Sequence, residues 1–141
     1  MKKYKVGITF GAFDLFHYGH LELLRRAKDI CDILVVGVSG DEYIKEHKGK
    51  TPVIPYKERS EIVKACKYVD VVLIQDYSRR FICLTKKELC ESAEADVLIV
   101  GDDWKGKTDW DGYDAEIPIL FLKRTEGIST TDIIKRIKDK E

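Results

Sequence analysis

The feature of this chain that most restricts its fold is a series of short apolar runs separated by segments with helical spacing. The run Ile33–Val38 is apolar throughout, as is typical of a strand covered on both faces in a parallel sheet. Before it, apolar residues recur three and four positions apart, which predicts a helix with one buried face; they are Leu21, Leu24, Ala27 and Cys31. Strands that alternate with helices in this way predict an α/β, doubly wound fold.

The same alternation continues along the whole chain. Strands are expected at residues 6–10, 33–38, 71–74, 97–100 and 117–122. Further helices are expected at residues 41–46, 56–67, 81–92 and 130–138, with a loop at residues 47–55. The residues expected to face inward from the last three helices are Ile62, Val63, Cys66, Phe81, Leu84, Leu89, Ile133, Ile134 and Ile137. Residues 1–141 are therefore predicted to form one Rossmann-like domain with a five-stranded, mostly parallel sheet.

Composition excludes several classes of function. Lys plus Arg equals Asp plus Glu, at 25 each, whereas a general nucleic-acid binder normally carries a basic excess. No apolar run approaches the ~20 residues that span a bilayer, and the basic start of the chain lacks the apolar core of a signal peptide. We therefore expect a cytoplasmic protein without nucleic-acid binding or membrane insertion.

The four cysteines do not form a metal site by their spacing. None of them makes a C-x-x-C pair, which leaves a zinc site without support. Free thiols, most of them packed as small apolar side chains, are the expected state of Cys31, Cys66, Cys83 and Cys90. No metal ligands are predicted from the protein itself.

Ligands of doubly wound folds bind outside the carboxyl ends of the strands, which directs attention to the loops that follow them. The first such loop, Gly11–His20, contains two of the three histidines of the chain, three residues apart with a glycine between them. Backbone N–H groups at the start of a helix bind anions, and two imidazoles beside them can stabilise charge that develops on a phosphate. This loop is therefore a candidate phosphate site.

A second candidate lies at the start of the last helix. Ser129 occupies an expected N-cap position, and Asp132 three residues later allows an arrangement similar to a capping box. The free N–H groups of this helix, the hydroxyls of Ser129 and Thr130, and the guanidinium of Arg124 could converge on a triphosphate. A plain capped surface helix is the alternative interpretation of this segment.

Three motifs resemble those of a known enzyme family. Gly11–His20 reads G-x-F-D-x-x-H-x-G-H and resembles the signature of the H-x-G-H nucleotidyltransferases. Arg124–Thr131 resembles the R-T-x-G-I-S-T-T signature of their cytidylyltransferase branch, and Gly101–Lys107 resembles a segment of the glycerol-3-phosphate cytidylyltransferases. The motifs occur in the order of the family and span nearly the whole chain. Ala12 stands where the family often has threonine, so one hydroxyl near the nucleotide is missing.

The resemblance implies an activity and a set of site residues. The enzyme would transfer CMP from CTP, with Mg²⁺, to a small phosphorylated alcohol, above all sn-glycerol 3-phosphate, and would form a homodimer. The catalytic residues implied are His17, His20, Lys48 and Arg124, with Lys50 as an alternative to Lys48. The residues implied to bind CTP and the acceptor are Gly11, Ala12, Phe13, Arg59, Asp102, Asp103, Trp104, Thr125, Gly127, Ile128, Ser129 and Thr130.

The acceptor has alternatives at this point. Residues 47–49, 58–59 and 64–70 also resemble the choline and ethanolamine branch of the family, so phosphoethanolamine, phosphocholine or another polyol phosphate remain candidates. A cationic acceptor needs aromatic faces or carboxylates, which Trp104, Trp110 and Tyr113 could supply. A nucleotide-binding module without catalysis is the remaining alternative, and the presence of both histidines argues against it.

Overall fold

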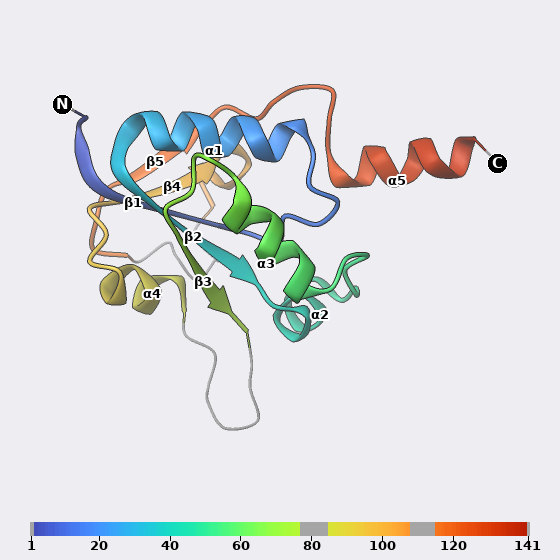
Figure 1. The fold of residues 1–141 in the computed structure, drawn as a ribbon, viewed down its shortest axis with the longest axis horizontal. Helices are drawn as coiled ribbons and strands as arrows, with labels where there is room; N and C mark the ends of the chain where they lie inside the picture. Colours follow the sequence, from blue (N-terminus) through green and yellow to red (C-terminus); the bar gives the residue numbers. More distant parts are fainter. Residues whose placement is uncertain (1, 77–84, 108–114, 141) are drawn as a thin grey trace.

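The computed structural model describes residues 2–76, 85–107 and 115–140. Its centre is a five-stranded sheet in the order β3-β2-β1-β4-β5, in which every neighbouring pair is parallel (Figure 1). The strands are β1 Tyr4–Gly11, β2 Cys31–Ser39, β3 Val71–Gln75, β4 Val97–Gly101 and β5 Ile119–Leu122. The helices are α1 Tyr18–Ile30, α2 Asp41–Lys48, α3 Tyr56–Ala65, α4 Lys86–Ser92 and α5 Thr130–Asp139, with a 3₁₀ turn η1 at Asp102–Trp104. The predicted α/β fold with a parallel sheet is confirmed.

The order of the strands locates the ligand-binding edge of the sheet. β1 lies in the centre, where Gly7 is level with Leu34 of β2 on one side and with Val97 of β4 on the other. The chain first builds outward from β1 to β2 and β3, and then returns to add β4 and β5 on the opposite side. The strand order therefore reverses between β1 and β4, and the crevice at their carboxyl ends is where such folds bind ligands.

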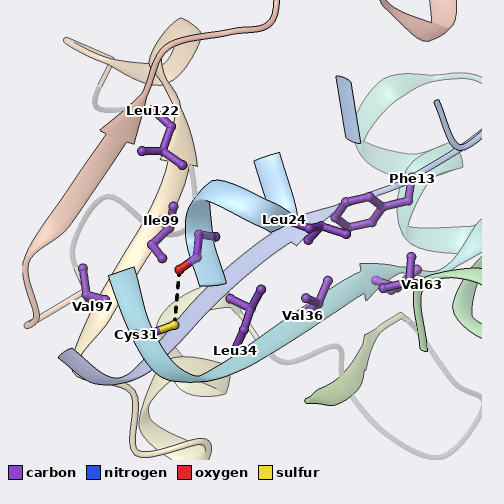
Figure 2. Packing of buried hydrophobic residues seen from close by; sticks show 11 residues of the cluster. Phe13, Leu24, Cys31, Leu34, Val36, Val63, Val97, Ile99 and Leu122 are labelled. Atoms are coloured by element: carbon purple, nitrogen blue, oxygen red, sulfur yellow. Dashed lines mark hydrogen bonds between the residues drawn. The ribbon is translucent and has the colours of Figure 1, made fainter. Parts of the chain in front are cut away.

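The core has two layers because both faces of the sheet are covered. On one face, Leu24 and Ala27 of α1 and Val63 of α3 pack against Leu34 and Val36 of β2 (Figure 2). The opposite face packs a second cluster, which includes Ile8, Val35, Cys90 and Leu98. Successive residues of a strand point to opposite faces, so a strand covered on both sides needs a continuous apolar run. This is why residues Ile33–Val38 of β2 are apolar without interruption.

Several predicted boundaries and burial assignments are wrong. Cys31 caps α1 but is the first residue of β2, where its buried thiol donates to the carbonyl of Ala27. α2 runs two residues beyond the predicted end, to Lys48, and stops at Gly49, whose φ of 67° suits glycine. Ile62 of α3 is 46% exposed, because the side chain that α3 inserts into the core is the adjacent Val63.

The last helix departs most from expectation. None of its residues is buried, and Ile137, which was expected to face inward, is 57% exposed. Figure 1 shows the reason: α5 lies at one end of the molecule, away from the sheet, so its apolar side has no sheet to pack against. Leu89 of α4 is buried as predicted, whereas Phe81, Cys83 and Leu84 lie outside the described residues.

Candidate active site

Two adjoining pockets occupy the carboxyl edge of the sheet beside β1. The inner pocket, about 200 Å³, is lined by Gly11–Asp14, Lys48 and Lys50 together with His20 and Thr130. The outer pocket, about 460 Å³, lies between the starts of α1 and α5 and is lined by residues that include His17, His20, Lys48, Asp103, Arg124, Thr125, Ile128, Ser129 and Thr130. His20, Lys48 and Thr130 line both pockets, so the two form one continuous site.

The two histidines of the first loop cap α1 and are held by its backbone. The Nδ1 atom of His17 accepts a hydrogen bond from the backbone N–H of Gly19 at 3.0 Å, and Nδ1 of His20 accepts one from the N–H of His17 at 3.2 Å. A ring nitrogen that accepts a hydrogen bond carries no proton, so both neutral rings carry theirs on Nε2. Each histidine therefore keeps one N–H donor for a ligand.

The environment keeps these imidazoles neutral. Burial lowers the pKa of His20 to about 3; the neighbouring imidazole of His17 acts in the same direction and the charge of Asp14 opposes it. Burial and the charge of Arg124 also lower the pKa of His17. The ring of His20 lies 5.3 Å from that of Phe13 and 5.4 Å from that of Phe16, between centroids, so apolar surface replaces water around it.

The sharp turn of the first loop explains its glycines and its strain. The two imidazoles stack with their centroids 3.8 Å apart, and a Cβ atom at Gly19 would lie 2.8 Å from the ring of His17. Phe13 and Leu15 adopt positive φ angles of 54° and 50°, which are unusual for residues with a Cβ atom. The burial of the Phe13 ring in the core, where it is 3% exposed, holds the loop in this conformation.

The start of α5 faces the histidines across the outer pocket. Ser129 is the N-cap, as predicted, and its Oγ accepts a hydrogen bond from the N–H of Asp132 at 3.0 Å. The hydroxyl of Thr130 donates to the carbonyl of Asp14 at 2.9 Å, which joins α5 to the first loop. Two helix N-termini, each with free N–H groups, thus point at the same space.

The segment before α5 adds the guanidinium of Arg124. Its backbone N–H donates to the Asp102 carboxylate at 3.3 Å, and Arg26 of α1 holds the preceding carbonyl, that of Lys123, at 2.6 Å. Gly127 has a φ of 78° and lines a neighbouring cavity of about 350 Å³ rather than the outer pocket. Of the sequence-predicted pair, Asp103 lines the outer pocket and Asp102 holds the loop.

Trp104 belongs to η1, but its side chain is outside the described part of the chain. The same holds for the whole of Trp110 and Tyr113. The aromatic contribution suggested from the sequence therefore stays a prediction.

Both lysines of the candidate pair face the inner pocket. Although part of the Lys48 side chain is exposed, loss of water around its ammonium group lowers its pKa. The charges of Lys50 and Lys86 lower this pKa further, while Asp103 opposes the shift. Lys48 lines both pockets and Lys50 only the inner one, so both join the site and Lys48 has the more central position.

Lys86 is a candidate that sequence reasoning missed. Its ammonium nitrogen lies 3.0 Å from the hydroxyl of Tyr43 and 5.5 Å from the ring centroid of Phe10, which lines both pockets. It is also close enough to Lys48 to lower the pKa of that residue. No spacing or motif marks Lys86 in the sequence, because only the fold brings the start of α4 to this edge.

The geometry corrects the expectation that Arg59 binds phosphate directly. This side chain is 1% exposed, and neither pocket has it in its lining. Its guanidinium donates to the carbonyls of Ala12, Ser39 and Ile54 and to the carboxylate of Asp41. The reason is steric: the arginine extends from α3 into the space beneath the loops, not into the pockets.

Among residues 2–76, 85–107 and 115–140, no group of three His, Cys, Asp or Glu side chains is arranged to hold a metal ion. No helix within those ranges is both long enough and apolar enough to cross a membrane.

This fold, with paired histidines and two helix starts around one pocket, suits a nucleotidyltransferase, and the comparisons give the family. A family model described as cytidylyltransferase-like matches residues 8–136. The chain belongs to the cytidylyltransferase-like family. The glycerol-3-phosphate cytidylyltransferase of Staphylococcus aureus is 38% identical over 95% of this chain and 96% of its own length.

One further relative and one solved structure are also similar to this chain. The ethanolamine-phosphate cytidylyltransferase of Dictyostelium discoideum is 40% identical over 90% of this chain, which corresponds to 35% of its own length. Among solved structures, the lipopolysaccharide core biosynthesis protein of Thermoplasma volcanium matches with a TM-score of 0.68 and 20% identity, covering 87% of this chain and 99% of that protein. The last likeness supports the fold alone.

Proposed function

We propose that this protein transfers CMP from CTP to sn-glycerol 3-phosphate, giving CDP-glycerol and pyrophosphate. The observation that carries the proposal is the outer pocket, where the paired histidines at the start of α1 face Arg124 and the start of α5. The lysine-lined inner pocket opens from it and offers a second anion site. The glycerol-3-phosphate relative, matched over nearly its full length, supports the choice of acceptor.

CTP occupies the outer pocket in this proposal. The N-termini of α1 and α5 supply free N–H groups and the positive ends of two helix dipoles. Arg124, Ser129 and Thr130 bind the triphosphate, and the Nε2–H groups of His17 and His20 donate to the α-phosphate and to the departing oxygen. Donors already fixed by the backbone need no reorganisation as charge develops, which is why they stabilise the transition state.

The reaction needs no covalent enzyme intermediate. A phosphate oxygen of the acceptor attacks the α-phosphorus in line, a new P–O bond forms, and the bond to the β-phosphate breaks, so that pyrophosphate leaves with the electron pair. The chain contributes positioning and charge neutralisation: Lys48, which lines both pockets, lies between the two phosphates that react.

Mg²⁺ enters with CTP in this proposal. Divalent magnesium usually binds substrate phosphates and one or two carboxylates rather than a protein cage, and the carboxylate that lines the outer pocket is that of Asp103. Asp103 would hold the ion, which would neutralise part of the triphosphate charge.

The inner pocket suits a polyol phosphate better than a cationic acceptor. Among the described residues the only carboxylate in its lining is that of Asp14, and both oxygens of this group accept backbone hydrogen bonds, from Val53 at 2.8 Å and from Ile54 at 2.9 Å. Lys48, Lys50 and the nearby Lys86 favour an anion and repel an amine. Phosphoethanolamine is the second candidate, on the strength of the Dictyostelium discoideum relative.

A homodimer in the cytoplasm completes the proposal. The resemblance of the motifs to the family supports the dimer, and light scattering of the purified chain tests it: a mass of one chain at micromolar concentration would contradict it.

The decisive experiment measures pyrophosphate release with each of the four nucleoside triphosphates and a set of acceptors, with product masses. With CTP and Mg²⁺, kcat/KM for sn-glycerol 3-phosphate should exceed that for phosphocholine and phosphoethanolamine by roughly tenfold or more, which corresponds to about 1.4 kcal/mol. Chelation of Mg²⁺ should abolish turnover. Equal rates with ATP would contradict the nucleotide assignment, and a faster reaction with either amine would contradict the acceptor.

A further inference from the structure

The buried guanidinium of Arg59 joins the first loop, which carries the histidines, to α2, which ends at Lys48. It donates to the carbonyl of Ala12 in the first loop at 2.7 Å, and to the carbonyl of Ser39, the last residue of β2, at 2.7 Å. It also donates to the carbonyl of Ile54 at 2.8 Å and forms an ion pair with Asp41, the first residue of α2, at 2.6 Å. A buried charge with this many hydrogen bonds has one well-defined arrangement.

Asp41 extends the same network to α3. Its carboxylate accepts the backbone N–H of Tyr56, the first residue of α3, at 3.0 Å as well as the guanidinium of Arg59. The start of α2 is thereby fixed to the start of α3 and to the loop between them. Because Lys48 is the last residue of α2 and Lys50 follows after Gly49 alone, this network sets where both lysines lie.

Asp14 makes an independent connection between the same two regions. It belongs to the first loop, and its carboxylate accepts the backbone N–H groups of Val53 and Ile54, 39 and 40 residues away along the chain. Its own carbonyl accepts the hydroxyl of Thr130. The loop beside the histidines therefore holds residues 53–54 from one side while Arg59 holds Ile54 from the other.

We propose that Arg59 and Asp14 are positioning residues for the acceptor: together they hold residues 53–56 against the first loop, so that Lys48 and Lys50 face the pocket of His20. This inference rests on the proposed function, since it assigns the lysines to the acceptor phosphate. Arg59 lines neither pocket. Asp14 lines the inner pocket, but both of its carboxylate oxygens accept backbone N–H groups and its negative charge would repel a phosphate, so we assign it no contact with the acceptor phosphate. A displacement of about 1 Å in a positioning group can cost a large factor in rate, so such a network has a direct effect on catalysis.

Two variants separate positioning from electrostatics. Arg59→Lys keeps the positive charge but cannot reproduce the four hydrogen bonds. Asp14→Asn removes a negative charge beside an anion site, which by itself would tighten the binding of any phosphate. If the residues act through position, KM for sn-glycerol 3-phosphate should nevertheless rise roughly tenfold in each variant, while the Kd for CTP, measured by titration calorimetry, stays within about twofold.

A second readout does not depend on turnover. Amide hydrogen exchange of the full chain should show that Val53 and Ile54 lose protection in Asp14→Asn while the core strands β1 and β2 keep theirs. The matched controls lie on the surface of α1, where Arg25 pairs with Glu22. Arg25→Lys and Glu22→Gln should leave both the kinetics and the exchange of residues 53–54 unchanged.

The outcomes are distinct. A Kd for CTP that rises as much as the acceptor KM in Arg59→Lys would mean direct contact with the nucleotide and would overturn the inference. An acceptor KM that is unchanged or lower in Asp14→Asn would also overturn the inference. If Arg59→Lys does not fold, the Asp14→Asn measurement tests the inference by itself. Absence of turnover in the unmodified protein would instead refute the proposed function, and the exchange experiment would still test the network.

Discussion

At the scale of single residues, the histidines divide their work between two ring nitrogens. The Nδ1 atoms of His17 and His20 cap the first turn of α1, and the Nε2–H groups remain for a ligand. Structural and chemical roles can therefore be removed separately. An asparagine at an N-cap places its oxygen where Nδ1 of histidine lies, but it has no group at the position of Nε2.

The first prediction uses this separation. His17→Asn should fold with nearly the stability of the unmodified protein, because the cap is retained, and should lose roughly 10²–10³ in kcat, because one transition-state donor is gone. His17→Ala should lose the same rate and, in addition, about 1 kcal/mol of stability. Urea unfolding and steady-state kinetics measure both effects. Near-normal kcat in a folded His17→Asn would show that Nε2 has no catalytic role.

At the scale of elements, α5 joins the first loop at its beginning, where the hydroxyl of Thr130 donates to the carbonyl of Asp14. None of its side chains is buried, whereas its N-cap Ser129 and its first residue Thr130 both line the outer pocket. α4 offers a comparison, since its N-cap Thr85 accepts the N–H of Glu88 in a capping box and lines neither pocket.

The second prediction compares these two caps. Thr85→Ala and Ser129→Ala each remove an N-cap worth about 1 kcal/mol to its helix. Only Ser129→Ala should also weaken CTP binding, by roughly tenfold, because it removes a hydrogen bond to a charged phosphate. Calorimetric titration with CTP and Mg²⁺ measures this difference. Equal CTP affinities in the two variants would mean that Ser129 is only a cap.

At the scale of the whole molecule, the depressed histidine pKa values connect the site to stability. In the folded protein the pKa of His20 is lowered to about 3, so this side chain stays neutral at any pH well above that value. Burial lowers the pKa of His17 as well. The unfolded chain takes up these protons near pH 6.5. Below that pH the unfolded state binds more protons than the folded state, so stability falls as pH decreases.

The third prediction follows from this sign. Between pH 6.5 and pH 5 the free energy of unfolding should fall by up to about 1.4 kcal/mol per pH unit because of His20, and His17 should add to the loss in the same direction. His20→Gln keeps a suitable capping side chain at the third helical position and does not titrate, so its loss over the same interval should be smaller. Urea unfolding at several pH values tests this. Parallel curves for the two proteins would contradict the assigned environment of His20.

Much of the architecture follows from local patterns in the sequence. The run Ile33–Val38 is apolar because both faces of β2 are covered, and Ser129 caps α5 because a hydroxyl there meets a free backbone N–H. The alternation of strands and helices predicts that the loops after the strands form the ligand-binding edge, since parallel strands place their carboxyl ends together. Each of these features can be recognised in the sequence from a few neighbouring residues.

What only the tertiary structure decided depends on segments far apart in the chain. Arg59 has the sequence context of a phosphate ligand, yet it lies beneath the loops because carbonyls from three segments surround it. Lys86 joins the site because α4 begins beside Phe10, and Ile137 stays exposed because no sheet lies next to α5. The sequence by itself determined which residues form strands, helices and caps, since those are local interactions. Burial and the pKa values that follow from it were decided by tertiary packing, because desolvation is set by whichever distant segments exclude water from a group.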